Sequence, residues 1–321
     1  MVRLNSTVKD LPAPTAKKPK GFLHEIARNK ILYLMCVPGL IILIMFNYIP
    51  FAGIWMAFTD FNVVDGIFGS KFVGLNNFKF FFAENMGWKV TYNTLIINFF
   101  SIIFGILIPV SIAVLLNEIR VAAFKKITQS MMFFPYFLSW VVVGAIIYGI
   151  FSSDIGVLNN MLKMFGMEPI SWYSEPKYWK AIIILASVWK WSGYNSIIYM
   201  AAMANFDSSL YEAAKVDGAS KLQRIMYLTV PMLKPTMIVL TLLSVGRIFY
   251  GDFGMIYGIV GNNPVLGEAV SVIDTYVYSS MRSLGFSYAT AVGLMQSVMG
   301  LILVTAANRT AKKLNDGEGL F

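Results

Sequence analysis

The stretch LYEAAKVDGASKLQRIMYLTVPMLKP, residues 210–235, is a polar interruption in a strongly apolar chain. Its charged side chains are Glu212, Lys215, Asp217, Lys221, Arg224 and Lys234, and two prolines stand near its end. Apolar segments of about twenty residues, long enough to cross the hydrocarbon core of a bilayer, lie on both sides of it. The stretch therefore predicts a short, helix-prone loop between two membrane-spanning helices.

The composition of the whole chain agrees with a membrane protein. Of its 321 residues, 57% are hydrophobic and only 13% are charged, whereas soluble domains carry about 25% charged residues. The single cysteine and the single histidine, His24, exclude a disulfide framework and a zinc site built on Cys/His clusters. The chain has no G-x-x-x-x-G-K-[ST] motif, so we expect no Walker A loop, and we also expect no catalytic residues, metal or cofactor on this chain.

Six segments are long and apolar enough to span a bilayer. They cover about residues 31–58, 93–116, 130–151, 181–204, 231–251 and 287–307. The chain lacks the strict alternation typical of outer-membrane barrels, which favours an all-α, polytopic fold. We expect one six-helix domain over 31–309, between polar tails at 1–30 and 310–321. The first tail lacks a signal-peptide pattern, so we expect it to be retained.

Lysine and arginine residues are distributed unevenly among the loops. Sixteen lie in the two tails and in the loops after the second and fourth spans, and seven lie in the other loops. The remaining three, Lys190, Lys234 and Arg247, lie in or beside spans. Because cytoplasmic loops carry the excess of these residues, the imbalance predicts that both termini and residues 207–230 face the cytoplasm.

The polar stretch has the signals of two short helices. Ser209 and Glu212 have the spacing of a capping box, and Asp207 is an alternative N-cap. Gly218 suits the left-handed conformation that follows a helix end, and Ser220 begins a second box of the form S-x-x-Q. A helix of about eight residues is unstable alone in water, so it needs a partner surface. An ordinary loop with well-capped helices is the alternative.

The sequence EAAKVDGASKLQRIMYLTVP resembles the EAA loop of importer permeases in the ATP-binding-cassette superfamily. That loop has Glu-Ala-Ala, a glycine four residues after the second alanine, and a hydrophobic-x-hydrophobic-Pro ending. The resemblance implies that 209–229 is a coupling helix that docks on a separate ATPase and transmits its ATP-driven closure to the spans. The residues implied in this contact are Ser209, Glu212, Ala213, Ala214, Lys215, Asp217, Gly218 and Pro231.

Further segments resemble the MalF-type sugar permeases, and within them the LplB-like branch for poly- and oligosaccharides. They are FVGLNNFKFFF (72–82), DFGMIYGIVGNNP (252–264) and residues 271–309. The resemblance implies six helices paired with a second, homologous permease in the cytoplasmic (inner) membrane of a bacterium. It also implies an ATPase dimer, which binds ATP and Mg, and an extracytoplasmic solute-binding protein that delivers the oligosaccharide.

Lys190 and Arg247 lie inside expected spans, and Asp252 directly follows the fifth span. Such groups are costly in a membrane and usually face a cavity or a partner. We hypothesise that the two cations favour an acidic oligosaccharide, such as one with uronic acid units. Two alternatives remain open. Arg247 can pair with Asp252 or reach an interface, and Lys190 can bind backbone carbonyls at a helix break made by Gly193.

Aromatic and amide residues near Lys190 suggest a path for a sugar. Trp191, Tyr194 and Tyr199 offer aromatic groups at a similar depth, and Trp191 and Asn195 share a helical face. The resemblance implies solute contacts on the third, fourth and fifth spans. The residues assigned to the path are Tyr136, Lys190, Trp191, Gly193, Tyr194, Asn195, Ser244, Arg247, Ile248 and Asp252.

Two other classes of protein compete with the importer permease. An ion-coupled secondary sugar transporter predicts inverted repeats and paired acidic sites near the midplane, and no convincing repeat is visible. An intramembrane enzyme needs a catalytic constellation, which one histidine in a polar tail and no paired aspartates do not provide. The external loops, 59–92, 152–180 and 252–286, are too short to hold a large external domain.

Overall fold

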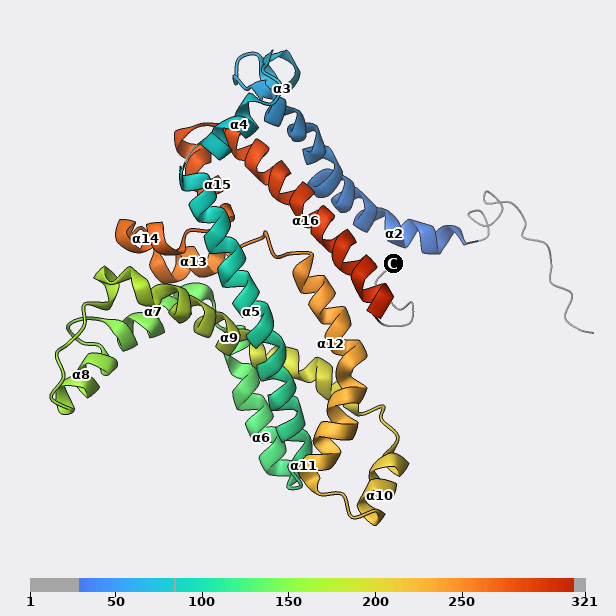
Figure 1. Ribbon diagram of the computed structural model, residues 1–321. Helices are drawn as coiled ribbons and strands as arrows, with labels where there is room; N and C mark the ends of the chain where they lie inside the picture. The colour runs from blue at the N-terminus through green and yellow to red at the C-terminus, as the bar shows by residue number, and fades with distance from the viewer. Residues whose placement is uncertain (1–28, 84, 315–321) are drawn as a thin grey trace, which may run out of the picture. The chain divides into compact units, whose positions relative to one another are not determined.

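The structure, a computed structural model, describes residues 29–83 and 85–314 (Figure 1). The chain divides into two compact units, residues 1–52 and residues 53–321. Most of the expected N-terminal tail, including His24, lies outside the described residues, and so does the end of the expected C-terminal tail.

The first unit is a continuous apolar helical segment. It holds α2 (Lys30–Leu43), the π-helical η1 (Ile44–Tyr48) and the start of the 3-10 helix η2 (Ile49–Phe58). Pro50 cannot donate a backbone hydrogen bond within a helix, and α geometry gives way shortly before it. No residue of α2 or η1 is buried, although nearly all are apolar. A helix that is apolar all round is typical of a membrane span.

The second unit is almost entirely helical. The strands found in its described residues are β1 (Thr59–Asp60) and β2 (Lys71–Phe72), which pair antiparallel. The longer helices are α5 (Asn85–Glu118), α6 (Ala122–Phe133), α7 (Trp140–Phe151), α9 (Trp179–Met203), α12 (Val230–Val245), α15 (Ile273–Ser283) and α16 (Phe286–Leu314). The shorter ones are α3 (Gly66–Gly69), α4 (Asn76–Ala83), η3 (Phe134–Phe137), α8 (Val157–Met164), η4 (Trp172–Ser174), η5 (Pro176–Tyr178), α10 (Ser208–Val216), α11 (Lys221–Arg224), η6 (Ile225–Thr229), α13 (Phe253–Val260) and α14 (Pro264–Val270).

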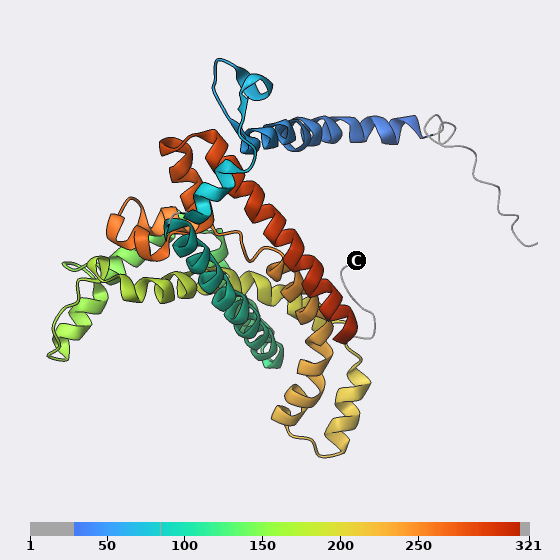
Figure 2. The ribbon, with the colours of Figure 1, turned by 45° about the horizontal axis from the view of Figure 1, so that its top comes forward.

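The pairing of α5 with α9 organises the second unit (Figures 1 and 2). One apolar core joins this pair to α7, α13 and α14 and includes Ile97 and the fully buried Trp179. Another joins it to α12 through Tyr199 and Leu233. A third core joins α4, α15 and α16 near Phe81. Burial of these apolar side chains holds α5, α9 and α12 around the space described below.

Four described helical segments are long and apolar enough to cross a membrane: Lys30–Phe58, Asn85–Glu118, Lys221–Val245 and Phe286–Thr310. A fifth is formed if Ala122–Phe137 and Trp140–Phe151 count as one span, although they meet at 103°. The helix α9, expected as the fourth span over 181–204, is 25 residues long but falls outside this set. It carries Lys190, Ser192 and Asn195 in its middle, which lower its hydropathy.

Two expected spans differ from the structure in shape. The third is sharply bent between Phe134 and Ser139 rather than straight. The fifth is helical only as far as Val245, and residues 246–252 are irregular where a helix to 251 was expected. In both places, backbone carbonyl oxygens lack a hydrogen bond within their own helix, and polar side chains from neighbouring helices donate to them instead. These side chains border the site described below.

Close helix contacts occur at glycines. A Cβ atom added to Gly193 would lie 1.8 Å from the carbonyl oxygen of Met132, so α6 and α9 meet backbone to backbone. A Cβ on Gly144 would lie 2.1 Å from the Gly258 carbonyl oxygen, which brings α7 equally close to α13. The expected helix break at Gly193 is wrong, because α9 runs through it without interruption. Gly193 serves packing instead.

Residues 207–230 form the two short helices that the sequence predicts. The helix α10 is capped by Asp207, whose carboxylate accepts the Ser209 amide at 2.9 Å. The Ser209–Glu212 box is therefore not the cap, and the alternative that the sequence offered is correct. Gly218 has φ +81°, as predicted, and Ser220 forms a complete capping box with Gln223. The helices α10 and α11 lie at the opposite end of the unit from α4 and α15 (Figures 1 and 2).

Candidate functional site

A central cavity of about 530 Å³ lies between α5, α9, α12 and the irregular segment 246–252. Its polar lining comes from helices distant in sequence: Asn98, Ser101, Trp191, Asn195, Ser244, Arg247, Tyr250 and Asp252. The volume falls within the range of about 300–1,000 Å³ that is usual for small-ligand sites. Aromatic rings can stack on sugar rings, while amides, hydroxyls and a guanidinium can bind hydroxyls and carboxylates. The cavity thus offers the chemical groups that bind a carbohydrate.

The irregular segment 246–252 supplies one wall of this cavity. The Asn98 side chain donates to the carbonyl oxygens of Ile248 and Tyr250 at 2.7 and 2.9 Å. Gln296 donates to the Phe249 carbonyl oxygen at 2.6 Å. In a membrane, irregular backbone persists only where protein or cavity water satisfies it. These amides therefore hold the segment, with its Arg247 side chain, in place.

A half-buried carboxylate completes this support. Asp274, at the start of α15, accepts hydrogen bonds from the Gly251 amide at 2.5 Å and from Gln296 at 3.0 Å. Burial raises the pKa of the Asp274 carboxyl, and these two hydrogen bonds act in the opposite direction. Asp274 thus connects α15 to the cavity wall.

Lys190 holds the second irregular segment, at the bend between α6 and α7. It is 5% exposed, and its ammonium donates to the carbonyl oxygens of Pro135 at 3.3 Å, Tyr136 at 2.9 Å and Leu138. The ammonium also lies 5.3 Å from the centre of the Trp140 ring, a cation–π distance. Lys190 therefore binds backbone carbonyls, as one of the sequence-based alternatives proposed, and it does not line the cavity.

The two irregular segments are joined by one hydrogen bond. The indole of Trp140, at the start of α7, donates to Asp252 at 2.9 Å, and the same carboxylate caps α13 by accepting the Met255 amide at 2.8 Å. No ion pair links Asp252 with Arg247 among the described residues. The alternative in which they neutralise each other is therefore wrong, and Arg247 faces the cavity with no described carboxylate within 4 Å.

An aromatic cluster adjoins the cavity through Trp191. The rings of Tyr136 and Tyr194 stack with centroids 4.4 Å apart, and Trp191 meets Tyr136 edge to face at 5.4 Å. Phe133 stacks on both of these tyrosine rings, at 5.5 Å from Tyr136 and 6.1 Å from Tyr194. Trp191 and Tyr194 are both more than one-third exposed. The cluster is an exposed aromatic surface beside a polar cavity.

The structure thus divides the ten residues that the sequence assigned to a solute path. Five line the cavity: Trp191, Asn195, Ser244, Arg247 and Asp252. Tyr136 and Tyr194 form the adjoining cluster. The other three have packing or bracing positions: Lys190 binds carbonyls, Gly193 contacts α6, and Ile248 packs in the core beside α15 and α16. The role of each in transport stays a prediction.

Sequence reasoning missed several residues of the site. Asn98 and Ser101 lie on α5 and line the cavity, and Gln296 lies on α16. Asn98 and Gln296 could have been identified from the sequence, because an amide side chain within an apolar span must find a hydrogen-bond partner. Ser101 Oγ is buried without a hydrogen-bond partner among the described side chains, which suits a group that meets water or a ligand in the cavity.

The segment assigned to ATPase contact presents an accessible surface. Glu212, Ala213, Lys215, Asp217 and Gly218 are exposed. A smaller pocket of about 360 Å³ lies between α10 and the turn into α12, bordered by Asp217, Gly218 and Arg224. The hydrogen bond from the Ser209 amide lowers the pKa of the Asp207 carboxyl below its ordinary value, so the cap is ionised and complete near neutral pH.

Comparison with known proteins gives a consistent result. Residues 105–315 match the family described as "Binding-protein-dependent transport system inner membrane component". The polygalacturonan/rhamnogalacturonan transport system permease protein YteP of Bacillus subtilis is 37% identical over 95% of this chain and 94% of its own length. Protein LplB of the same organism is 36% identical over 98% of both chains.

A solved structure extends the likeness to the fold. One chain of a bacterial alginate ABC transporter, crystallised in complex with an alginate pentasaccharide-bound periplasmic protein, superposes with a TM-score of 0.83. The two sequences are 30% identical, and the match covers 94% of this chain and 100% of that chain.

Proposed function

Because this chain belongs to the family of binding-protein-dependent transport system inner membrane components, we propose that it is the permease subunit of an importer for acidic oligosaccharides. It is a multi-pass membrane component of an ABC transporter for sugars, and not an enzyme. The solute passes from a binding protein through a path that this chain forms with a second, homologous permease. In this proposal α9 is also a span, the fourth along the chain, which brings the total to six, and both termini are cytoplasmic.

The central cavity is the observation that carries this proposal. It joins polar groups from α5, α9 and α12 to the aromatic cluster at Trp191, inside a unit whose outer helices are apolar. Polar groups in a membrane are retained where they meet a solute, water or each other. An oligosaccharide needs both kinds of surface, because its ring faces are apolar and its edges carry hydroxyls.

The acidic preference rests on Arg247. It is the cation of the cavity wall, and no described carboxylate neutralises it. A guanidinium binds a carboxylate through two parallel hydrogen bonds. Lys190 is no longer assigned to binding an acidic sugar, because its ammonium donates hydrogen bonds to backbone carbonyl oxygens. The alginate importer, which matches this chain in fold, is described as importing an acidic polysaccharide, in agreement with a uronate substrate.

Residues 207–230 connect this path to an ATPase in the same proposal. The helix α10 and Gly218 dock on a separate ATPase dimer, which binds ATP and Mg. Its closure moves α11 and α12, which continue from the loop as one long helical segment. Because Ser244 lies on this segment and Arg247 directly follows it, the movement reaches the cavity wall. The ion-coupled alternative is not favoured, because the solved structures that this chain matches belong to ABC transporters.

Uptake by the complete complex tests this function. The chain is co-expressed with its neighbouring permease, ATPase and binding protein, and the complex is reconstituted in liposomes. We expect ATP-dependent uptake of an oligouronate to exceed that of a neutral oligomer of equal length. Arg247→Gln should reduce this preference by roughly 10- to 150-fold, because losing one hydrogen bond to a charged group costs about 1.5–3 kcal/mol.

Two further variants separate the coupling role from the path. Gly218→Pro combined with Glu212→Arg should abolish sugar-stimulated ATP hydrolysis while the complex still assembles. Lys190→Met should lower thermal stability without a selective effect on the acidic sugar. Equal uptake of acidic and neutral oligomers by the wild type would overturn the acidic preference. Uptake without ATP would overturn the importer itself.

A further inference from the structure

A second pocket, of about 420 Å³, lies apart from the central cavity and shares no lining residue with it. It is formed by the start of α5, by η5 with the start of α9, and by α14. Three lysines border it, Lys89, Lys177 and Lys180, together with Tyr92 and Glu268. No role described above uses this pocket.

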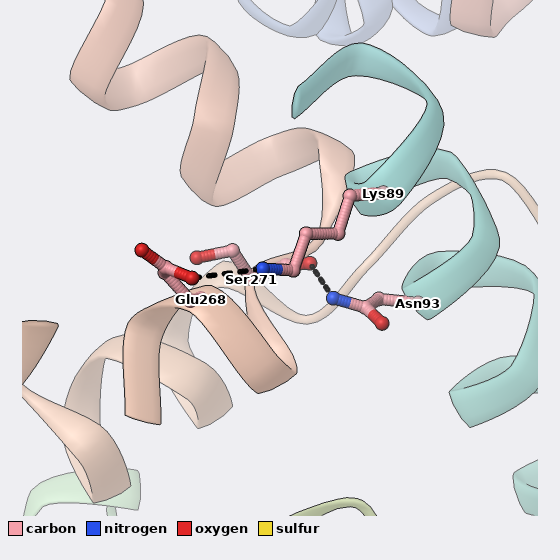
Figure 3. Close-up of polar contacts among 4 residues, drawn as sticks. All are labelled: Lys89, Asn93, Glu268 and Ser271. Atoms are coloured by element: carbon pink, nitrogen blue, oxygen red, sulfur yellow. Dashed lines mark hydrogen bonds and ion pairs between the residues drawn. The ribbon is translucent and has the colours of Figure 1, made fainter. Parts of the chain in front are cut away.

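The lysines of this pocket are incompletely neutralised. Lys89 pairs with Glu268 at 2.9 Å (Figure 3), and Lys177 pairs with Glu175 at 3.2 Å. Both pairs are solvent-exposed, so each contributes little and is readily exchanged for another anion. Lys180 lies 4.9 Å from the centre of the Tyr92 ring and has no carboxylate within 4 Å among the described residues. Lys180 is therefore a cation without a carboxylate partner among the described residues. It lies beside two lysines, Lys89 and Lys177, whose carboxylate partners can be exchanged for another anion.

The walls of this pocket are fixed by buried polar contacts. The Asn93 side chain, 1% exposed, donates to the Ser271 carbonyl oxygen at 3.1 Å, one turn of α5 below Lys89 (Figure 3). The Ile273 amide donates to the buried hydroxyl of Thr94 at 2.9 Å. Together they hold α14 and the start of α15 against α5. Lys89 on α5 and Glu268 on α14 thus lie on elements that these hydrogen bonds hold together.

The position of these lysines in the chain is unusual. Only seven lysine and arginine residues occur in the loops expected outside the membrane, the side on which such residues are depleted. Three of the seven border this one pocket. Their concentration at one place suggests a use for positive charge there.

We propose that this pocket binds the carboxylate of a uronate unit of the oligosaccharide before it enters the central cavity. Lys180 supplies the free charge, and Lys89 and Lys177 exchange their exposed partners for the sugar carboxylate. Tyr92 is 58% exposed and offers an aromatic ring to the sugar. The volume suits a small-molecule unit better than a single protein side chain. The proposal rests on the proposed function and adds an entry subsite to it.

Uptake kinetics of the whole reconstituted complex test this subsite. The pocket variant combines Lys89→Gln, Lys177→Gln and Lys180→Gln. The matched control combines Lys71→Gln, Lys79→Gln and Lys163→Gln, which removes three exposed charges from the same side of the protein but outside the pocket. For an oligouronate, we expect the pocket variant to raise KM about tenfold with kcat changed less than about twofold. The control variant and a neutral oligomer should show no such change.

Amine footprinting provides a readout that does not depend on transport. A water-soluble acylating reagent is applied to the wild-type complex, and the modification of Lys180 is followed by mass spectrometry. The oligouronate should slow acylation of Lys180 but not that of Lys163, and the effect should fade at high salt. A neutral oligomer should protect neither residue.

Each contrary outcome has a separate meaning. If the wild type imports the oligouronate but the pocket variant behaves like the wild type, the subsite is disproved and the proposed function stands. If the wild type imports no oligouronate, the proposed function is contradicted, and the subsite that rests on it is contradicted with it. A KM change of equal size for neutral sugar overturns the subsite in favour of a docking surface for the binding protein. An effect seen only in vesicles with anionic lipid overturns it in favour of a headgroup site.

Discussion

Gly193 and Lys190 show how strongly single residues of α9 constrain the molecule. Gly193 lets the backbone of α6 touch α9, and Lys190 binds three carbonyl oxygens one helical turn earlier. Both were expected to meet the solute, because the resemblance to importer permeases implies solute contacts on the span that carries them. The structure uses both to fix the bend that precedes α7.

The contact at Gly193 gives the first prediction. Gly193→Ala places a methyl group against the Met132 carbonyl, and since backbone cannot easily move, we expect a loss of about 1–3 kcal/mol. The apparent melting temperature of the purified complex measures it. Gly149→Ala in α7 is the control, because no atom lies within 4 Å of the added Cβ. That change should be neutral or slightly stabilising. Equal melting temperatures for Gly193→Ala and the wild type would contradict the close contact.

Asp207 gives a pH-dependent prediction. The Ser209 amide lowers the pKa of the Asp207 carboxyl below its ordinary value of 3.8. Because the folded pKa is depressed, the cap stabilises α10 fully above that value, and its contribution is lost as the pH falls through the folded pKa. Hydrogen exchange of α10, corrected for intrinsic rates, should therefore accelerate only in acid. Asp207→Asn, which caps without titrating, should remove this dependence, whereas Asp207→Ala should show fast exchange at every pH.

At the scale of elements, the two irregular segments separate this fold from a bundle of straight helices. The chain leaves α-helical geometry at 134–139 and at 246–252, and Asn98, Lys190 and Gln296 bind the carbonyl oxygens released there. The Trp140–Asp252 hydrogen bond then joins both segments. A bend that is held at several points gives the cavity wall a defined shape.

Asn98 provides the prediction at this scale. Asn98→Leu leaves the carbonyl oxygens of Ile248 and Tyr250 without their donor, and each unsatisfied group costs about 1–3 kcal/mol. We expect a clear fall in the apparent melting temperature of the complex. Ser111→Ala on the same helix removes only an exposed hydroxyl bonded to its own helix, so it should change stability by less than about 0.5 kcal/mol. Similar melting temperatures for the two variants would show that Asn98 does not support the segment.

At the scale of the whole molecule, the arrangement of charges predicts the orientation in the membrane. Lys215, Lys221 and Arg224 gather at the α10–α11 end of the second unit, which lies opposite α4 and α15 (Figure 2). Because positive residues concentrate on the cytoplasmic side, we expect α10 inside the cell and α8 outside.

Thiol labelling measures this orientation. The chain has one cysteine, so Cys36→Ala provides a cysteine-free background. In that background, Glu212→Cys on α10 and Met164→Cys on α8 each place a thiol at an exposed position. A membrane-impermeant maleimide applied to intact cells should label Met164→Cys and leave Glu212→Cys unlabelled until the cells are opened. The opposite pattern would invert the proposed topology.

Much of the molecule follows from sequence because the signals are local. The length of apolar segments, the cap at Ser220 and the left-handed Gly218 each depend on a few neighbouring residues. The EAA stretch is likewise recognised from residues at a fixed spacing within one short segment. The choice between Asp207 and Ser209 as the N-cap was less certain, since both side chains can reach an amide of the first turn.

The cavity was only partly predictable, because it depends on which distant residues meet. Asn98 and Gln296 are polar residues in apolar helices, and nothing near them in sequence indicates their partners 22 or more residues away. The sequence by itself therefore determined the class, the helices and the polar stretch at 210–235. The tertiary structure decided that Arg247 faces the cavity while Lys190 does not, because a buried ammonium binds whichever carbonyl oxygens the packing of α6 against α9 brings within reach.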